Sequence, residues 1–105
     1  MKNRSSKRAK ALAIPKAVKD RVWERDDHCC IWCGSPYANP EAHFIPRSRG
    51  GLGIEENVVT LCRLCHDAFD HGSAAMRQEI GNYCREYLKA MYPEWDEKKL
   101  IYRKD

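Results

Sequence analysis

Apolar residues recur at helical spacing in several segments of the chain, and Pro and Gly residues separate these segments. Val18 and Val22 lie four residues apart and follow Pro15, a residue type that is favourable in the first turn of a helix. A longer segment with its apolar positions on one helical face ends before Pro93. The pattern predicts helices over residues 15–25, 64–71 and 73–91.

Two short segments between the first two predicted helices are typical of β-strands. Residues 41–45 end at Pro46, which cannot donate to a strand ladder, and residues 58–61 are rich in β-branched side chains. The loop between them contains a Gly-Gly pair and is long for a hairpin, as loops with a function commonly are. The sequence therefore predicts an α+β fold, with residues 13–105 in a single domain.

Residues 1–12 have no apolar periodicity and predict a disordered basic arm. Residues 1–25 contain nine Lys or Arg residues against two Asp or Glu residues, whereas the net charge of the whole chain is +4. Such a segment is typical of proteins that bind polyanions, because lysine and arginine release counterions from phosphates. A solvated tail would have the same composition, so charge alone leaves both interpretations open.

The composition indicates a soluble protein with a small hydrophobic core. Charged residues make up 32% of the 105 residues, and the mean hydropathy is -0.73. A core of this size needs a cross-link or a metal ion for stability. The sequence shows no apolar signal segment and no run of about 18 apolar residues that could span a membrane. We therefore expect a cytoplasmic protein whose six cysteines are reduced.

Four of the cysteines form two pairs with the same spacing. Cys30 and Cys33 form one Cys-x-x-Cys pair, and Cys62 and Cys65 form the other. Two such pairs can place four thiolates around one tetrahedral Zn²⁺ ion, which would supply stability that the core lacks. Redox pairs or buried free thiols are the alternatives, and Cys29 could compete with its neighbour for the metal.

A further set of residues, between the cysteine pairs and just after them, resembles the HNH endonuclease family. His43 is followed three residues later by Pro46, and a Gly-Gly loop and Asn57 precede the second predicted strand. The second cysteine pair is followed directly by His66 at the start of a helix. The resemblance is to the zinc-bearing, four-cysteine branch and covers about residues 20–71. The C-terminal part is similar to small nucleases of phages and prophages.

This resemblance implies a ββα-metal fold, also called a His-Me finger, with flanking helices and metal-dependent hydrolysis of DNA. His43 would be the general base, and Asn57 would brace the long loop and orient that base. His66 would bind a catalytic Mg²⁺, Mn²⁺ or Ni²⁺ ion together with Asp70, four residues later on the same helix face. The residues that bind DNA phosphates would be Arg47 and Arg49.

One position departs from the family pattern. The residue before the base is usually an Asp or His that binds the metal ion, but it is Ala42 here. Glu41 lies on the same side of the predicted strand as His43 and is a candidate substitute ligand. Two alternatives stay open on the helix: His66 could join the zinc site, and His71 could replace the helix carboxylate.

Three functional hypotheses are therefore compatible with the sequence. The leading one is an endonuclease that nicks or cuts double-stranded DNA, as a homodimer or within a larger phage-type assembly. The main alternative is a non-catalytic zinc module that binds DNA or a protein partner. A thiol redox protein is the third and weakest, because no βαβ pattern surrounds either cysteine pair.

Overall fold

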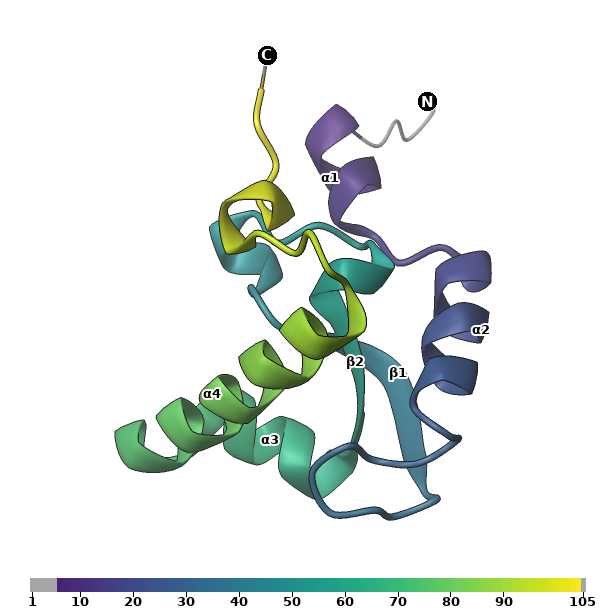
Figure 1. Ribbon diagram of the computed structural model, residues 1–105. Helices are drawn as coiled ribbons and strands as arrows, with labels where there is room; N and C mark the ends of the chain where they lie inside the picture. The colour runs from purple at the N-terminus through teal and green to yellow at the C-terminus, as the bar shows by residue number, and fades with distance from the viewer. Residues whose placement is uncertain (1–5, 105) are drawn as a thin grey trace, which may run out of the picture.

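A two-stranded antiparallel sheet forms the centre of the structure, a computed structural model that describes residues 6–104. Helix α2 packs on one side of the sheet, and α3 packs against both the sheet and α4 (Figure 1). Among the described residues, no helix has the length and apolar character needed to cross a membrane. The main elements are α1 (Lys7–Leu12), α2 (Lys16–Arg25), β1 (Ala38–His43), β2 (Val58–Cys62), α3 (Arg63–His71) and α4 (Ala74–Met91).

The predicted hairpin is confirmed, although its first strand is shifted along the chain. β1 and β2 pair in antiparallel fashion, and β1 covers Ala38–His43 where the sequence predicted residues 41–45. The strand ends early because the main chain of Ile45 bonds elsewhere. Its N–H donates to the Asn57 side chain over 2.8 Å, and its C=O accepts from the same side chain over 3.1 Å. The long loop is therefore fixed by a side chain.

The three predicted helices are confirmed, each within one residue at both ends. Pro15 is the residue that precedes α2, which places its fixed φ where no helical N–H is lost. Ser73 begins α4, where its hydroxyl accepts a hydrogen bond from the main chain of Met76 over 3.1 Å. Residues of this kind at the helix ends explain why the ends could be predicted from the sequence alone.

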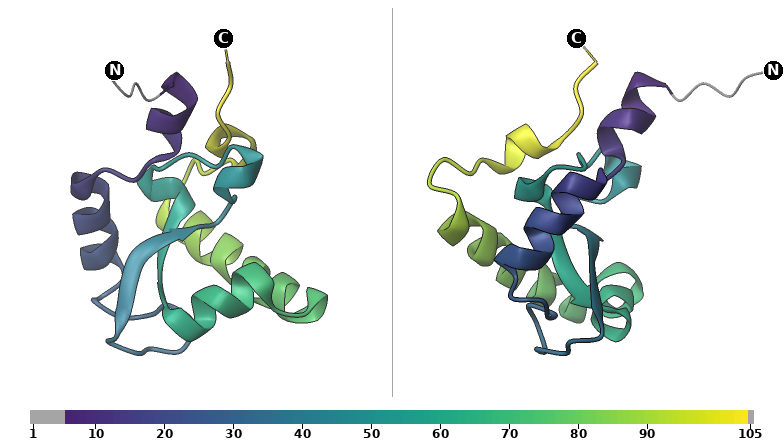
Figure 2. Two further views of the ribbon diagram at one scale, coloured as in Figure 1. Left: turned by 180° about the vertical axis from the view of Figure 1, so that it is seen from behind. Right: turned by 90° about the vertical axis from the view of Figure 1, so that its right-hand side faces the viewer.

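The structure differs from the predicted disordered arm over residues 7–12, which form the short helix α1. Ser6 caps the helix by accepting from Ala9 N–H over 3.0 Å. Leu12 is only 3% exposed, so the segment is anchored by burial of an apolar side chain that shows no periodic partner in the sequence. Residues 1–5 of the predicted arm lie outside the described residues. Figure 2 shows α1 and the C-terminal 3-10 helix η3 (Glu97–Leu100) at the same end of the molecule.

A buried ion pair connects α2 to the hairpin and to α4. The guanidinium of Arg25 lies 2.7 Å from a carboxylate oxygen of Asp26, which is 3% exposed. Asp26 also accepts from the main chain of Thr60 over 2.9 Å and from the Tyr87 hydroxyl over 2.6 Å. Arg25 donates in addition to the Val58 carbonyl over 2.7 Å. Because every member has partners, this network can hold three elements together despite the cost of burying charge.

Candidate active site and metal centre

The four paired cysteines meet at one point in the structure. Their sulfur atoms all lie within 4.8 Å of one another, and the Sγ atoms of Cys33 and Cys62 are 3.6 Å apart. Zn–S bonds of about 2.3 Å in a tetrahedron require S–S distances of about 3.8 Å. The cluster therefore has the dimensions of a zinc site. Within residues 6–104, it is the only group of three or more Cys, His, Asp or Glu ligand atoms gathered this closely.

Main-chain N–H groups are directed at two of the sulfurs, and at Cys30 they favour the thiolate, which is the form that binds metal. Cys33 N–H points at the sulfur of Cys30 over 3.4 Å, and Cys65 N–H points at the sulfur of Cys62 over 3.5 Å. Burial raises the pKa of Cys30, but amides directed at its sulfur outweigh burial and lower this pKa to about 7. Burial and the neighbouring sulfurs raise the pKa of Cys65. A divalent cation would relieve this repulsion between thiolates, so the donor set fits zinc.

The other two cysteines lie outside this cluster. Cys29 directs its sulfur toward the Asp26 carbonyl at 3.5 Å, so the competition between Cys29 and Cys30 is settled in favour of Cys30. Cys84 is fully buried in the core, and burial raises the pKa of its thiol to about 12. It therefore acts as an apolar core residue, as its place on the inner face of a helix indicates.

Helix α3 connects the cysteine cluster to a second set of polar residues. Cys62 is the residue that caps α3, and Cys65 lies in its first turn. The next residue is His66, whose Nε2 lies 3.3 Å from a carboxylate oxygen of Asp70. The two side chains are four residues apart and lie close enough to reach one ion together. His66 faces this carboxylate and is not among the cysteine cluster, so it does not join the zinc site.

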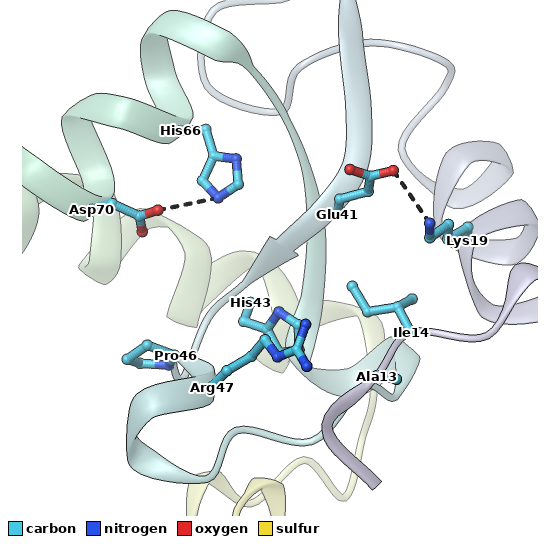
Figure 3. A pocket seen from close by; sticks show the side chains of 9 residues that line it. All are labelled: Ala13, Ile14, Lys19, Glu41, His43, Pro46, Arg47, His66 and Asp70. Atoms are coloured by element: carbon cyan, nitrogen blue, oxygen red, sulfur yellow. Dashed lines mark hydrogen bonds and ion pairs between the residues drawn. The ribbon is translucent and has the colours of Figure 1, made fainter. Parts of the chain in front are cut away.

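These two α3 residues face the end of β1 across an open hollow of about 410 Å³. Figure 3 shows His66 and Asp70 on one wall, with Glu41 and His43 from β1 opposite. His71 does not line this hollow, so it does not take the place of Asp70 there. The full lining is Ala13, Ile14, Lys19, Glu41, His43, Pro46, Arg47, His66 and Asp70.

The His43 ring is held by a main-chain carbonyl from the N-terminal segment. Its Nε2 lies 2.9 Å from the carbonyl oxygen of Leu12. A carbonyl can only accept a hydrogen bond, so Nε2 carries the proton and Nδ1 of the neutral ring keeps its lone pair. Burial lowers the pKa of His43 and outweighs the Leu12 carbonyl, which raises it; the charge of Arg47 lowers it further. The ring is therefore neutral at pH 7 and able to accept a proton.

The remaining predicted site residues have distinct positions. Asn57 is fully buried and bonds only to main-chain groups of the loop, including the Leu52 carbonyl over 2.8 Å. It braces the loop without lining the hollow. Arg47 lines the hollow, whereas Arg49 lines a neighbouring one. Glu41 lines the hollow with its carboxylate 3.3 Å from the ammonium of Lys19.

Sequence reasoning missed two contributors to this site. The Leu12 carbonyl is a main-chain group, and no residue type identifies such an acceptor in advance. Lys19 faces the hollow from α2, where one lysine among many in a basic segment carries no distinguishing signal. Ala42, where the family pattern expects a ligand, is fully buried in the core and offers no donor to the hollow.

Comparison with known protein families gives one match. Residues 30–80 match the family model described as HNH endonuclease, and this segment contains both strands, α3 and the start of α4. No curated protein matches the chain. The resemblance found in the sequence is therefore confirmed over residues 30–80, and the fold is a small α+β unit with a four-cysteine site suited to zinc.

Proposed function

We propose that this protein is a metal-dependent endonuclease that hydrolyses phosphodiester bonds in double-stranded DNA, in the manner of the phage-type nucleases that it resembles. The observation that carries the proposal is the arrangement of His43 opposite His66 and Asp70 across one hollow. A general base and a pair of metal ligands are the parts that such hydrolysis requires. A zinc module that only bound DNA would need no such constellation.

His43 is the general base in this proposal. Its unprotonated Nδ1 takes a proton from a water molecule as the water oxygen attacks phosphorus. The P–O3′ bond breaks, the electron pair goes to the 3′ oxygen, and solvent protonates it, leaving 3′-hydroxyl and 5′-phosphate ends. The Leu12 carbonyl, 2.9 Å from Nε2, keeps the ring in the required tautomer and stabilises the imidazolium that forms.

The other residues of the hollow bind and orient. A divalent ion held by His66 and Asp70 would supply positive charge to the phosphoryl group and the leaving oxygen. Glu41 is the proposed third ligand in place of the missing donor at Ala42, and it would have to leave Lys19 to serve as one. Arg47 lines the same hollow, and its guanidinium suits a phosphate oxygen.

A plasmid-nicking assay tests this proposal. We expect the zinc-loaded protein to convert supercoiled plasmid to nicked or linear DNA with Mg²⁺, Mn²⁺ or Ni²⁺, because a hard carboxylate beside an imidazole suits these ions. Without an added divalent ion, conversion should stop. DNA binding without conversion in all three ions would favour the non-catalytic zinc module instead.

A second prediction concerns the segment that carries Leu12. A Cβ placed on Gly53 would lie 1.9 Å from the carbonyl oxygen of Ala13 and 2.9 Å from that of Leu12. Gly53→Ala must therefore displace this segment, including the Leu12 carbonyl that holds His43. Because a displacement of about 1 Å can cost on the order of 100-fold in rate, we expect a loss of that size in the nicking rate. The ¹⁵N shifts of the His43 ring should also change from a single tautomer to a mixture.

The matched control for this variant is Gly81→Ala in α4. A Cβ at Gly81 meets only a Phe69 ring atom at 3.5 Å, an ordinary contact, so the fold should accept it. We expect this control to keep both the nicking rate and the ring shifts of His43. An unchanged rate and a single tautomer in Gly53→Ala would remove the N-terminal segment from the mechanism.

A further inference from the structure

A second hollow adjoins the first, and most of its lining residues have no part in the proposed hydrolysis. Its volume is about 490 Å³, and it shares His43, Pro46 and Asp70 with the first hollow. Its own lining comes from the loop after β1, the end of α3 and the first turn of α4. The lining residues that the first hollow lacks are Phe44, Ser48, Arg49, Phe69, His71 and Arg77.

The two arginines of the second hollow form no ion pair with an acidic side chain of the described residues. Arg21, Arg25 and Arg85 each lie within 3.0 Å of a carboxylate oxygen, so their charges are balanced within the fold. Over the described part of the chain, neither Arg49 nor Arg77 has an acidic partner within ion-pair distance. Two guanidinium groups without an acidic partner therefore line the same hollow, and a polyanion would neutralise their charge.

Arg77 is also held in place. Its Nε donates to the carbonyl of Gly72 over 3.0 Å, which fixes the guanidinium beside the end of α3. The two terminal nitrogens have no partner in the structure from residue 6 to residue 104, so they are available to a ligand with two acceptor oxygens. A guanidinium with this geometry is well suited to a phosphate group. Ser48 adds a hydroxyl that can donate to the same kind of group.

The acid that the two hollows share does not cancel this charge. Asp70 lies at their common edge, but its carboxylate is directed at His66 at 3.3 Å. A metal ion held by this pair would leave the second hollow with the positive charges of Arg49 and Arg77. Because His43 lines both hollows, a phosphate placed at His43 would have the second hollow directly beside it.

We propose that the second hollow binds the phosphate next to the scissile one, with Arg49 and Arg77 as its ligands. This inference rests on the proposed function, and it adds one requirement: at least one further phosphate must lie on this side of the cleaved bond. The recognition is of backbone charge, and it carries no base specificity. A terminal bond without that flanking phosphate is a poor substrate.

The test measures binding of a fluorescein-labelled 20-base-pair duplex as a function of salt, with no added divalent ion and therefore no cleavage. Each phosphate contact contributes about 0.9 to the slope of log K against log salt. Because both arginines bind one phosphate, we expect the Arg49→Ala, Arg77→Ala double variant to reduce the slope by about 0.9. Arg77→Ala alone should reduce it by part of that amount. Arg77→Lys should restore the slope, because it keeps the charge.

Arg63→Ala is the matched control. Arg63 is an exposed arginine at the opposite end of α3 and lines neither hollow, so its removal should leave the slope unchanged. An unchanged slope in Arg77→Ala, or an equal loss in the control, would overturn the proposal. The outcome is separable from that of the plasmid assay: nicking with an unchanged slope rejects the second hollow alone, and a reduced slope without nicking rejects hydrolysis alone.

Discussion

His43→Ala is expected to lower the rate of plasmid nicking by about 100-fold to 10,000-fold, the range that a general base contributes. The side chain is half-buried at the end of β1, and its loss removes the only proposed proton acceptor for the attacking water. The fold should survive, because the buried core of the hairpin lies on the other face. Rates are to be measured with saturating divalent ion, beside circular dichroism and zinc content of the same preparation.

His28→Ala is the control for this variant. His28 stacks on the Trp23 ring with centroids 5.0 Å apart and bonds to Glu24, and it does not line the hollow. Its removal should leave nicking intact. Equal rates in His43→Ala and the unaltered protein would exclude His43 as the base and would leave the zinc-stabilised binding module as the better account.

Removal of zinc is expected to unfold the domain. Structural zinc contributes about 10–16 kcal/mol in zinc-finger peptides, which is comparable to the whole stability of about 5–15 kcal/mol of a native protein. The cysteine cluster joins the start of α3 to the loop before β1, so both elements lose their attachment together. We expect chelation, or Cys62→Ser, to abolish the cooperative thermal transition in calorimetry.

Cys29→Ser provides the matched control for zinc loss. Cys29 directly precedes a proposed ligand but lies outside the cluster, so this variant should bind one zinc ion and melt like the unaltered protein. A cooperative and unchanged transition in the metal-free protein would show that the hydrophobic core is sufficient, and it would refute a structural role for the metal.

The parts of the site that were predictable have a signature in residue type and spacing. The two Cys-x-x-Cys pairs converge as expected, and His66 with Asp70 follows from helical periodicity alone. Asn57, at the end of the long loop, was expected to brace that loop. Hydrogen bonds from its side chain to the main chain of Ile45 and Leu52 explain how it can do so. Residue type and the spacing of nearby residues in the sequence were sufficient to predict these features.

The parts that could not be predicted depend on contacts between distant segments. The Leu12 carbonyl lies 31 residues from His43 along the chain, and nothing in the residue type of a leucine marks its main chain as a hydrogen-bond acceptor. The helix over residues 7–12 was read as disorder because its stability comes from docking on the loop, where Gly53 N–H donates to the Ala11 carbonyl over 3.0 Å. Tertiary contact overrides weak local propensity in such segments.

The Arg25 network limits how this domain could be transplanted. Residues 30–80 match the family, yet Arg25 and Tyr92, which bond to each other over 3.0 Å, lie outside that segment on either side. Arg25 also donates a hydrogen bond to the Val58 carbonyl. The Leu100 carbonyl accepts a hydrogen bond from the Leu52 N–H of the long loop over 2.8 Å. A chimaera built from the matched segment alone would leave these groups without their partners. The smallest graft that keeps the hairpin and its loop in shape therefore runs from α1 to η3.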